Sequence, residues 1–190
     1  MALKSLDVLV NEVLNLNVQN ASIVDVSVIR FSKEFRVLCE QNKCGHYNRN
    51  WMCPPGLGRF EDLMEQARRY KQGLVFQTVH KLTKSFDFKG MYEGAKIHEQ
   101  IVRNVLRHFV DQSGIKEVLP LGIVPCKFCE VCAYVEGEKC SNPEKAIASL
   151  ESYGIDGGHL LKHCGMPYRH GKLTLSYAGC LLFNVDGTAS

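Results

Sequence analysis

The chain has 190 residues, nine of them cysteine, and its formal net charge at pH 7 is only +3. This length is typical of one domain, here residues 1–190, and such a chain buries about 70% of its unfolded surface without needing disulfides. Opposite charges are interspersed without a basic tail or stripe, which argues against a nucleic-acid-binding protein. No apolar run approaches the ~18 residues of a membrane span, and residues 1–17 lack the features of a signal peptide. We therefore expect a cytoplasmic protein without a membrane partner.

The N-terminal part of the chain predicts three helices and one strand. Residues 5–16 carry apolar side chains at helical spacing, and Ser5 is suited to cap the N-terminus of that helix. Residues 23–29 alternate valines with polar residues, which is typical of a half-buried strand. Residues 33–42 and 59–70 predict two further helices, and a turn-rich loop separates them.

The central part predicts a strand, a long helix and a second strand. Residues 73–82 are β-branched and apolar enough for a strand. Residues 91–111 place large apolar side chains at steps of four, which predicts a long helix. Residues 115–123 read as a strand, and Pro120 indicates that this strand lies at an edge or a bulge because proline cannot donate to a sheet ladder.

The C-terminal part predicts one more helix and one more strand. Residues 142–154 have helix punctuation, with Asn142 at the N-cap, Pro143 at the first helical position and Gly154 at the end. Residues 172–183 alternate in the manner of a strand.

Together these elements predict an α/β chain, more closely an α+β sandwich with a mixed sheet of about four strands and about five helices. Two long cysteine-rich loops, at about residues 39–58 and 122–142, interrupt the regular elements. Long loops in a compact domain usually carry function, so we expect these two to be metal-binding loops.

The second loop contains the motif Cys126-x2-Cys129-x2-Cys132-x7-Cys140. Three cysteines at consecutive x2 spacing wrap the chain tightly, and this is the arrangement that bacterial ferredoxins use for a [4Fe-4S] cluster. Structural zinc is an alternative, although it favours two separated pairs of cysteines. A thioredoxin-like redox pair is a third reading, but it needs only one C-x-x-C.

The first loop contains the motif Cys39-x4-Cys44-x8-Cys53, which is less specific alone. The three thiols are either further ligands or small buried hydrophobes. Gly, Asn and Pro dominate the loop, so it is a poor candidate for a packed strand or helix. Tyr47 and Trp51 are suited either to shield a cluster from water or to anchor the loop by burial.

The two motifs together resemble one known family. The stretches "CGHYNRNWMCPPGLG" and "CKFCEVCAYVEGEKCSNPEKAIASLESYGID" are similar to the two signature blocks of the predicted metal-binding proteins called the domain of unknown function 2284. This family is common in anaerobic bacteria and archaea, and the resemblance extends from about Cys39 to the final strand. It implies an iron–sulfur protein of anaerobic redox metabolism.

Seven cysteines are therefore the candidate metal ligands: Cys39, Cys44, Cys53, Cys126, Cys129, Cys132 and Cys140. Two closed four-iron clusters need eight thiols, and Cys164 is a candidate for the eighth, whereas Cys180 falls in a strand pattern and reads as a core thiol. A cluster with only three thiolates leaves one iron open to a ligand, as in catalytic metal sites.

Three functions follow as hypotheses. The first is an electron-transfer protein that hands single electrons from a [4Fe-4S]-type cluster to a redox protein partner. The second is a cluster enzyme with an open iron that handles sulfur or a small ligand. The third is a zinc-stabilised binding protein without redox chemistry. The sequence names no catalytic residue for any of them.

Overall fold

The computed structural model describes residues 4–115, 117–123 and 125–185. Its centre is a mixed five-stranded sheet with the strand order β1-β2-β5-β3-β4. The strands are β1 (Asn20–Asp25), β2 (Gln72–Lys81), β3 (Val118–Gly122), β4 (Ala148–Ser149) and β5 (Thr174–Phe183). Neighbouring strands are antiparallel except for β3 and β4, which pair in parallel.

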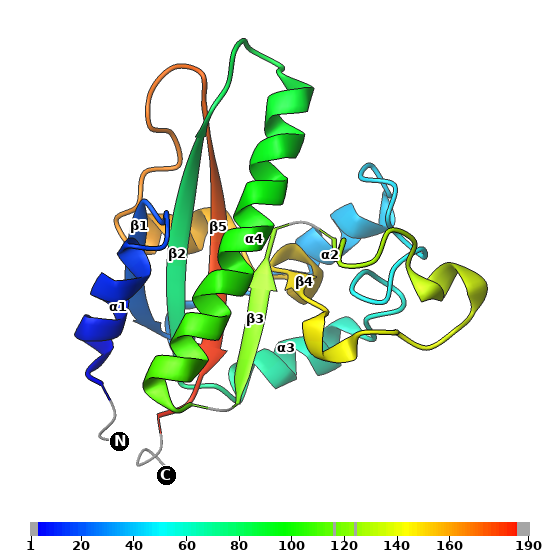
Figure 1. Cartoon of the computed structure of the whole chain (residues 1–190). Helices are drawn as coiled ribbons and strands as arrows, with labels where there is room; N and C mark the ends of the chain where they lie inside the picture. Colours follow the sequence, from blue (N-terminus) through cyan, green and yellow to red (C-terminus); the bar gives the residue numbers. More distant parts are fainter. Residues whose placement is uncertain (1–3, 116, 124, 186–190) are drawn as a thin grey trace.

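The described residues contain five helices: α1 (Leu6–Leu14), α2 (Lys33–Glu40), α3 (Phe60–Arg68), α4 (Phe88–Ser113) and α5 (Gly157–His163). Four of them pack on the sheet, whereas α2 contacts the 3₁₀ turn at Glu151–Tyr153. The long α4 runs across the sheet, and α1 lies beside it (Figure 1). These two helices share one hydrophobic core with the sheet, and α3 and α5 share a second core on the opposite face. The α+β class is thus confirmed.

The alternation of side chains along β2 separates the two cores. Leu74 and Phe76 are fully buried on the α4 side of the sheet, and Val75 between them is buried on the α3 side. Successive side chains in a strand point to opposite faces, so this apolar run serves both cores at once. A strand buried on both faces explains why the middle of β2 is almost continuously apolar.

Helix α4 has clear local causes for both of its ends. The Asp87 carboxylate accepts a hydrogen bond from the backbone N–H of Gly90 at 3.0 Å, which caps the N-terminus. Gly114 ends the helix in the left-handed conformation, with φ at 71°. Between them, Ile101, Val105 and Phe109 form part of a buried stripe at steps of four. The helix predicted over residues 91–111 is confirmed, and the observed helix is a few residues longer at each end.

The prediction of one helix over residues 142–154 is wrong. This segment forms a 3₁₀ turn at Pro143–Lys145, the two-residue strand β4, and a second 3₁₀ turn at Glu151–Tyr153. Ile147 packs into the α4 core and Leu150 into the opposite core. The segment therefore buries side chains on both sides of the sheet. Its two-residue strand β4 is the fifth strand, which the sequence did not predict.

Two smaller expectations can be compared with the structure. Strand β4 pairs only with Leu121 and Gly122 of β3, so Pro120 lies where β3 borders β5 alone, as its missing N–H suggested. The predicted strand over 115–123 includes Lys116, which lies outside the described residues. No helix within the described ranges is long and apolar enough to cross a membrane.

Candidate metal centre

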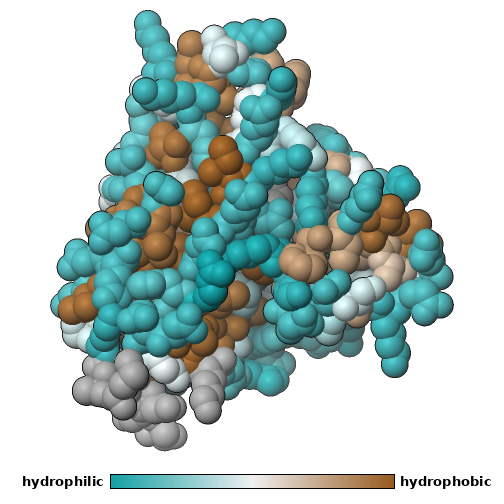
Figure 2. Space-filling model, viewed as in Figure 1, coloured by the Kyte–Doolittle hydropathy of each residue, from teal (hydrophilic) through white to brown (hydrophobic). Residues whose placement is uncertain are grey.

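Two cysteine-bearing loops lie next to each other beyond the β4 edge of the sheet (Figure 1). The first cysteine loop (residues 41–59) connects α2 to α3, and the second cysteine loop (residues 123–147, of which 124 is not described) connects β3 to β4. Figure 1 shows them in cyan and yellow-green on the same side of the molecule. In Figure 2 they form a lobe with hydrophobic residues exposed among hydrophilic ones; Val131 and Val135 are 64% and 53% exposed.

An aromatic contact joins the tips of the two loops. The indole N–H of Trp51 donates to the backbone carbonyl of Glu138 at 2.9 Å. The Tyr134 ring meets the Trp51 ring edge-on, with centroids 4.8 Å apart, and the Tyr134 hydroxyl donates to Asn48 Oδ1 at 2.8 Å. A Cβ on Gly56 would lie 2.6 Å from the Tyr134 ring, so glycine is needed for this approach. The aromatic residues of the first loop therefore hold the second loop in place.

Asn50 makes a second connection and is itself buried, with 5% of its surface exposed. Its Nδ2 donates to the backbone carbonyl of Cys126 at 2.7 Å, and its Oδ1 accepts from the backbone N–H of Met52 at 2.9 Å. Its own carbonyl accepts from the backbone N–H of Cys53 at 3.0 Å. One asparagine thus orients a cysteine of each motif.

The four cysteines of the second motif line one small cavity: Cys126, Cys129, Cys132 and Cys140. Asn50, Trp51 and Met52 of the first loop close the cavity from the other side. Its volume is about 20 Å³, which is room for one water-sized atom. The side-chain amide of Asn142 donates to Cys129 Sγ at 3.5 Å. Hydrogen bonds to ligand sulfur are a usual feature of metal sites with thiolate ligands.

The thiols of the first motif lie in the same electrostatic neighbourhood. Cys53 is buried, and burial together with the thiols of Cys44, Cys39, Cys126 and Cys132 raises its pKa to about 12. Burial likewise raises the pKa of Cys39, and Glu151 and Cys44 raise it further. Burial and neighbouring groups thus disfavour the thiolate forms of Cys53 and Cys39, and a bound cation would oppose both effects.

Within residues 4–115, 117–123 and 125–185, no three His, Cys, Asp or Glu side chains lie close enough together to hold a metal ion. The four thiols of the second motif therefore surround their cavity without converging on one point. Coordination requires rotation of these side chains or movement of the loops. Cys129 and Cys132 are only partly buried, which leaves their side chains room to rotate.

The two remaining cysteines lie in the core between β5 and α5. Cys180 is fully buried in β5, as its strand pattern predicted, and burial and the Cys164 thiol raise its pKa. Cys164 caps the C-terminus of α5 and packs against the same core. Burial is the cause of its raised pKa. These positions give Cys164 no contact that favours a role as an eighth ligand.

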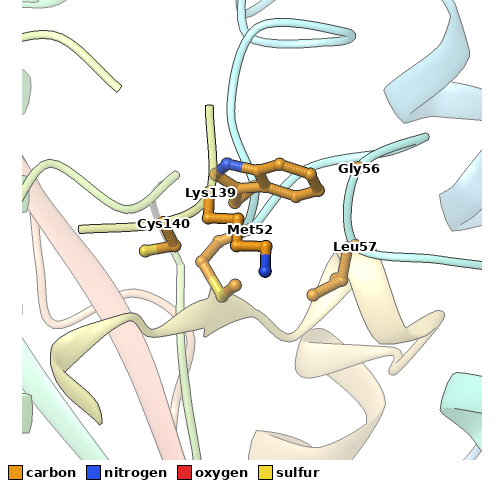
Figure 3. A pocket seen from close by; sticks show the side chains of 6 residues that line it. Met52, Gly56, Leu57, Lys139 and Cys140 are labelled. Atoms are coloured by element: carbon orange, nitrogen blue, oxygen red, sulfur yellow. The ribbon is translucent and has the colours of Figure 1, made fainter. Parts of the chain in front are cut away.

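An apolar pocket of about 270 Å³ opens beside Cys140. Met52, Leu57 and Lys139 line it, and Figure 3 shows these side chains arranged around the pocket together with Cys140. Trp51, Met52 and Cys140 line both this pocket and the small cysteine cavity, so the two are adjacent. The aromatic and thioether groups shield Cys140 from part of the solvent.

Three residues support the two loops without having been predicted to do so. Asn142 was expected to cap a helix, but its side chain donates to Cys129 instead. Arg36 was not singled out in the sequence, yet it is buried and donates to the backbone carbonyl of Gly58 at 2.7 Å. Asn50 sits in a turn-rich stretch, where asparagine is common for local reasons. Its position directly before Trp51-Met52-Cys53 was the only available signal.

Comparison with known proteins bears on the same segments. The family model described as "Predicted metal-binding protein (DUF2284)" matches residues 22–183, a range that contains both cysteine loops and all seven candidate ligands. No protein with a curated description matches the chain, and no solved structure does. The match covers most of the chain, and the chain therefore belongs to the DUF2284 family of predicted metal-binding proteins.

Proposed function

We propose that this protein binds an iron–sulfur cluster of the [4Fe-4S] type through its cysteine loops and transfers electrons to a redox protein partner. One observation carries the proposal: Cys126, Cys129, Cys132 and Cys140 line a single cavity although their motif spans a long irregular loop. The spacing of the first three is the one that cubane clusters use. Membership of a predicted metal-binding family supports the coarser part of the proposal.

The residues that would hold the cluster are the four thiols of the second motif, with Cys39, Cys44 and Cys53 as ligands of a second cluster or of a shared one. A cluster in this place supplies single-electron transfer. The Asn142 amide, which donates to Cys129 Sγ, would stabilise charge on that sulfur. Trp51 and Met52 would limit the access of water, which also affects the reduction potential.

The size of the cavity favours a second candidate. A volume of about 20 Å³ suits one ion better than a cluster of four irons and four sulfides, for which the loops must open. A single zinc ion with four thiolates is the alternative that fits this volume. In that case the metal would stabilise the contact between the loops, and the protein would be a binding protein without redox chemistry.

Anaerobic purification followed by iron, acid-labile sulfide and zinc analysis separates the two candidates. The cluster proposal expects iron and labile sulfide in equal amounts, with about four of each per cluster. Roughly one zinc per chain without labile sulfide would overturn it in favour of the zinc protein. Electron paramagnetic resonance of the reduced protein, with and without added small ligands, then tests for an open iron.

A cytoplasmic location and an anaerobic host are parts of the same proposal. All nine cysteines are free thiols, including the exposed Cys44, and this agrees with a reducing compartment. A partner that accepts electrons would approach the lobe of the two loops, where the thiols lie nearest to the surface.

A further inference from the structure

An open cleft adjoins the small cysteine cavity. Its volume is about 660 Å³, which lies within the range of roughly 300–1,000 Å³ that is typical of small-molecule sites. Cys126, Cys129 and Cys132 line both the cleft and the small cavity, and so does Asn50. A molecule bound in the cleft would therefore touch the thiols of the proposed metal site.

The charge lining this cleft is strongly one-sided. Arg49 of the first loop, Lys96 of α4 and Lys127 of the second loop all line it, and Glu130 is the only carboxylate among its described lining residues. In the described part of the chain, none of the three cations forms an ion pair with a carboxylate. Three elements thus bring unneutralised positive charge to one concave surface.

The Tyr92 ring contacts two of these cations. The Lys127 ammonium lies 4.4 Å from the ring centroid and the Lys96 ammonium lies 4.7 Å from it. The face of an aromatic ring attracts each ammonium, but two like charges beside one ring also repel each other. Because both lysines line the cleft, an anion bound there would be attracted to both ammoniums and would offset their repulsion.

We infer that the cleft binds a small anion with phosphate or carboxylate groups, directly beside the proposed metal site. Arg49 is suited to a planar two-point contact with such a group, and the two lysines act as point charges. A concave site of this volume favours a small ligand over a protein surface. The inference does not depend on which metal the thiols hold.

The test is isothermal titration calorimetry of the purified protein with inorganic phosphate and with succinate, which separate the two kinds of anion. At least one probe should bind saturably. Lys96→Gln and Arg49→Gln should each weaken that binding roughly tenfold, because each removes a hydrogen bond between charged groups. Lys172→Gln is the matched control: Lys172 is exposed, does not line the cleft, and should leave the affinity unchanged.

Equal affinities in wild type, Lys96→Gln and Arg49→Gln would overturn the inference, as would the absence of saturable binding of both probes. Binding of a poly-glutamate peptide without binding of either small anion would also overturn it, in favour of an acidic protein partner. Metal content is measured in every sample before and after titration. If protein purified anaerobically contains neither iron nor zinc but still binds the anion, the inference about the cleft holds and the proposed metal function is refuted.

Discussion

Asn50→Ala tests whether the contact between the two loops prepares the metal site. Asn50 is buried and satisfies the Cys126 carbonyl and the Met52 N–H at once. Removal of its amide leaves both groups without a partner, and each such loss costs about 1–3 kcal/mol. The two hydrogen bonds lie near the surface of the lobe. We therefore take the lower half of that range for each group, which gives about 2–4 kcal/mol in total.

This cost appears as lost metal affinity if Cys126 must be held in place before the metal binds. A loss of 2 kcal/mol corresponds to about a 30-fold weaker affinity. Chelator competition, with the metal that copurifies, measures the ratio between variant and wild type. Asn104→Ala is the matched control, because Asn104 is exposed on α4 and accepts only from Arg107 at 2.8 Å. Its metal affinity should equal that of wild type.

Two results would refute this reasoning. If Asn50→Ala binds the metal as tightly as Asn104→Ala does, the contact between the loops plays no part in forming the site. If Asn50→Ala loses thermal stability in the metal-free protein by the full amount but keeps its metal affinity, the asparagine is a structural residue of the first loop alone.

The remaining predictions concern the ligands, the buried histidine and one glycine. Cys129→Ala should lose metal and thermal stability together, whereas Cys164→Ser should keep its metal; full metal content in Cys129→Ala would contradict this. Burial lowers the pKa of His98 from 6.5 to about 4. The unfolded chain therefore binds the extra proton, and the free energy of unfolding should fall by about 3 kcal/mol as the pH drops from 6.5 to 4. Denaturant titrations at several pH values measure this, and an equally steep fall in His98→Gln would exclude the histidine as its cause. Gly154→Ala should destabilise the fold by about 1–3 kcal/mol, since Gly154 has φ at +71° and an added Cβ would lie 2.2 Å from the Phe60 ring. Gly158→Ala, where no such contact exists, should not lower the melting temperature.

Sequence periodicity predicted the long helix α4 well but the first strand only in part, because β1 ends at Asp25 and Val26–Val28 form a 3₁₀ turn. Helix α4 was found from apolar residues at steps of four, because only one side of it meets the sheet. Segment 142–154 was predicted as a helix from its capping residues and not from periodicity. The segment forms two short 3₁₀ turns instead, and between them Ile147 and Leu150 enter cores on opposite faces of the sheet.

The composition of the candidate site was predictable, but its support was not. The x2 spacing of Cys126, Cys129 and Cys132 identifies a metal motif from local sequence alone. The residues that fasten the loops act across the chain: Asn50 is 76 positions from Cys126, and Trp51 is 87 positions from Glu138. No local sequence pattern predicts such contacts, because each depends on how the fold brings the two loops to the same edge of the sheet.

The central proposal is that Cys126, Cys129, Cys132 and Cys140 hold an iron–sulfur cluster, and X-ray absorption spectroscopy of anaerobically purified protein tests it most directly. The account predicts iron with a first shell made only of sulfur and a second shell of neighbouring iron, both lost in Cys129→Ala. A first shell of nitrogen and oxygen, or a metal signal that is unchanged in Cys129→Ala, would contradict it.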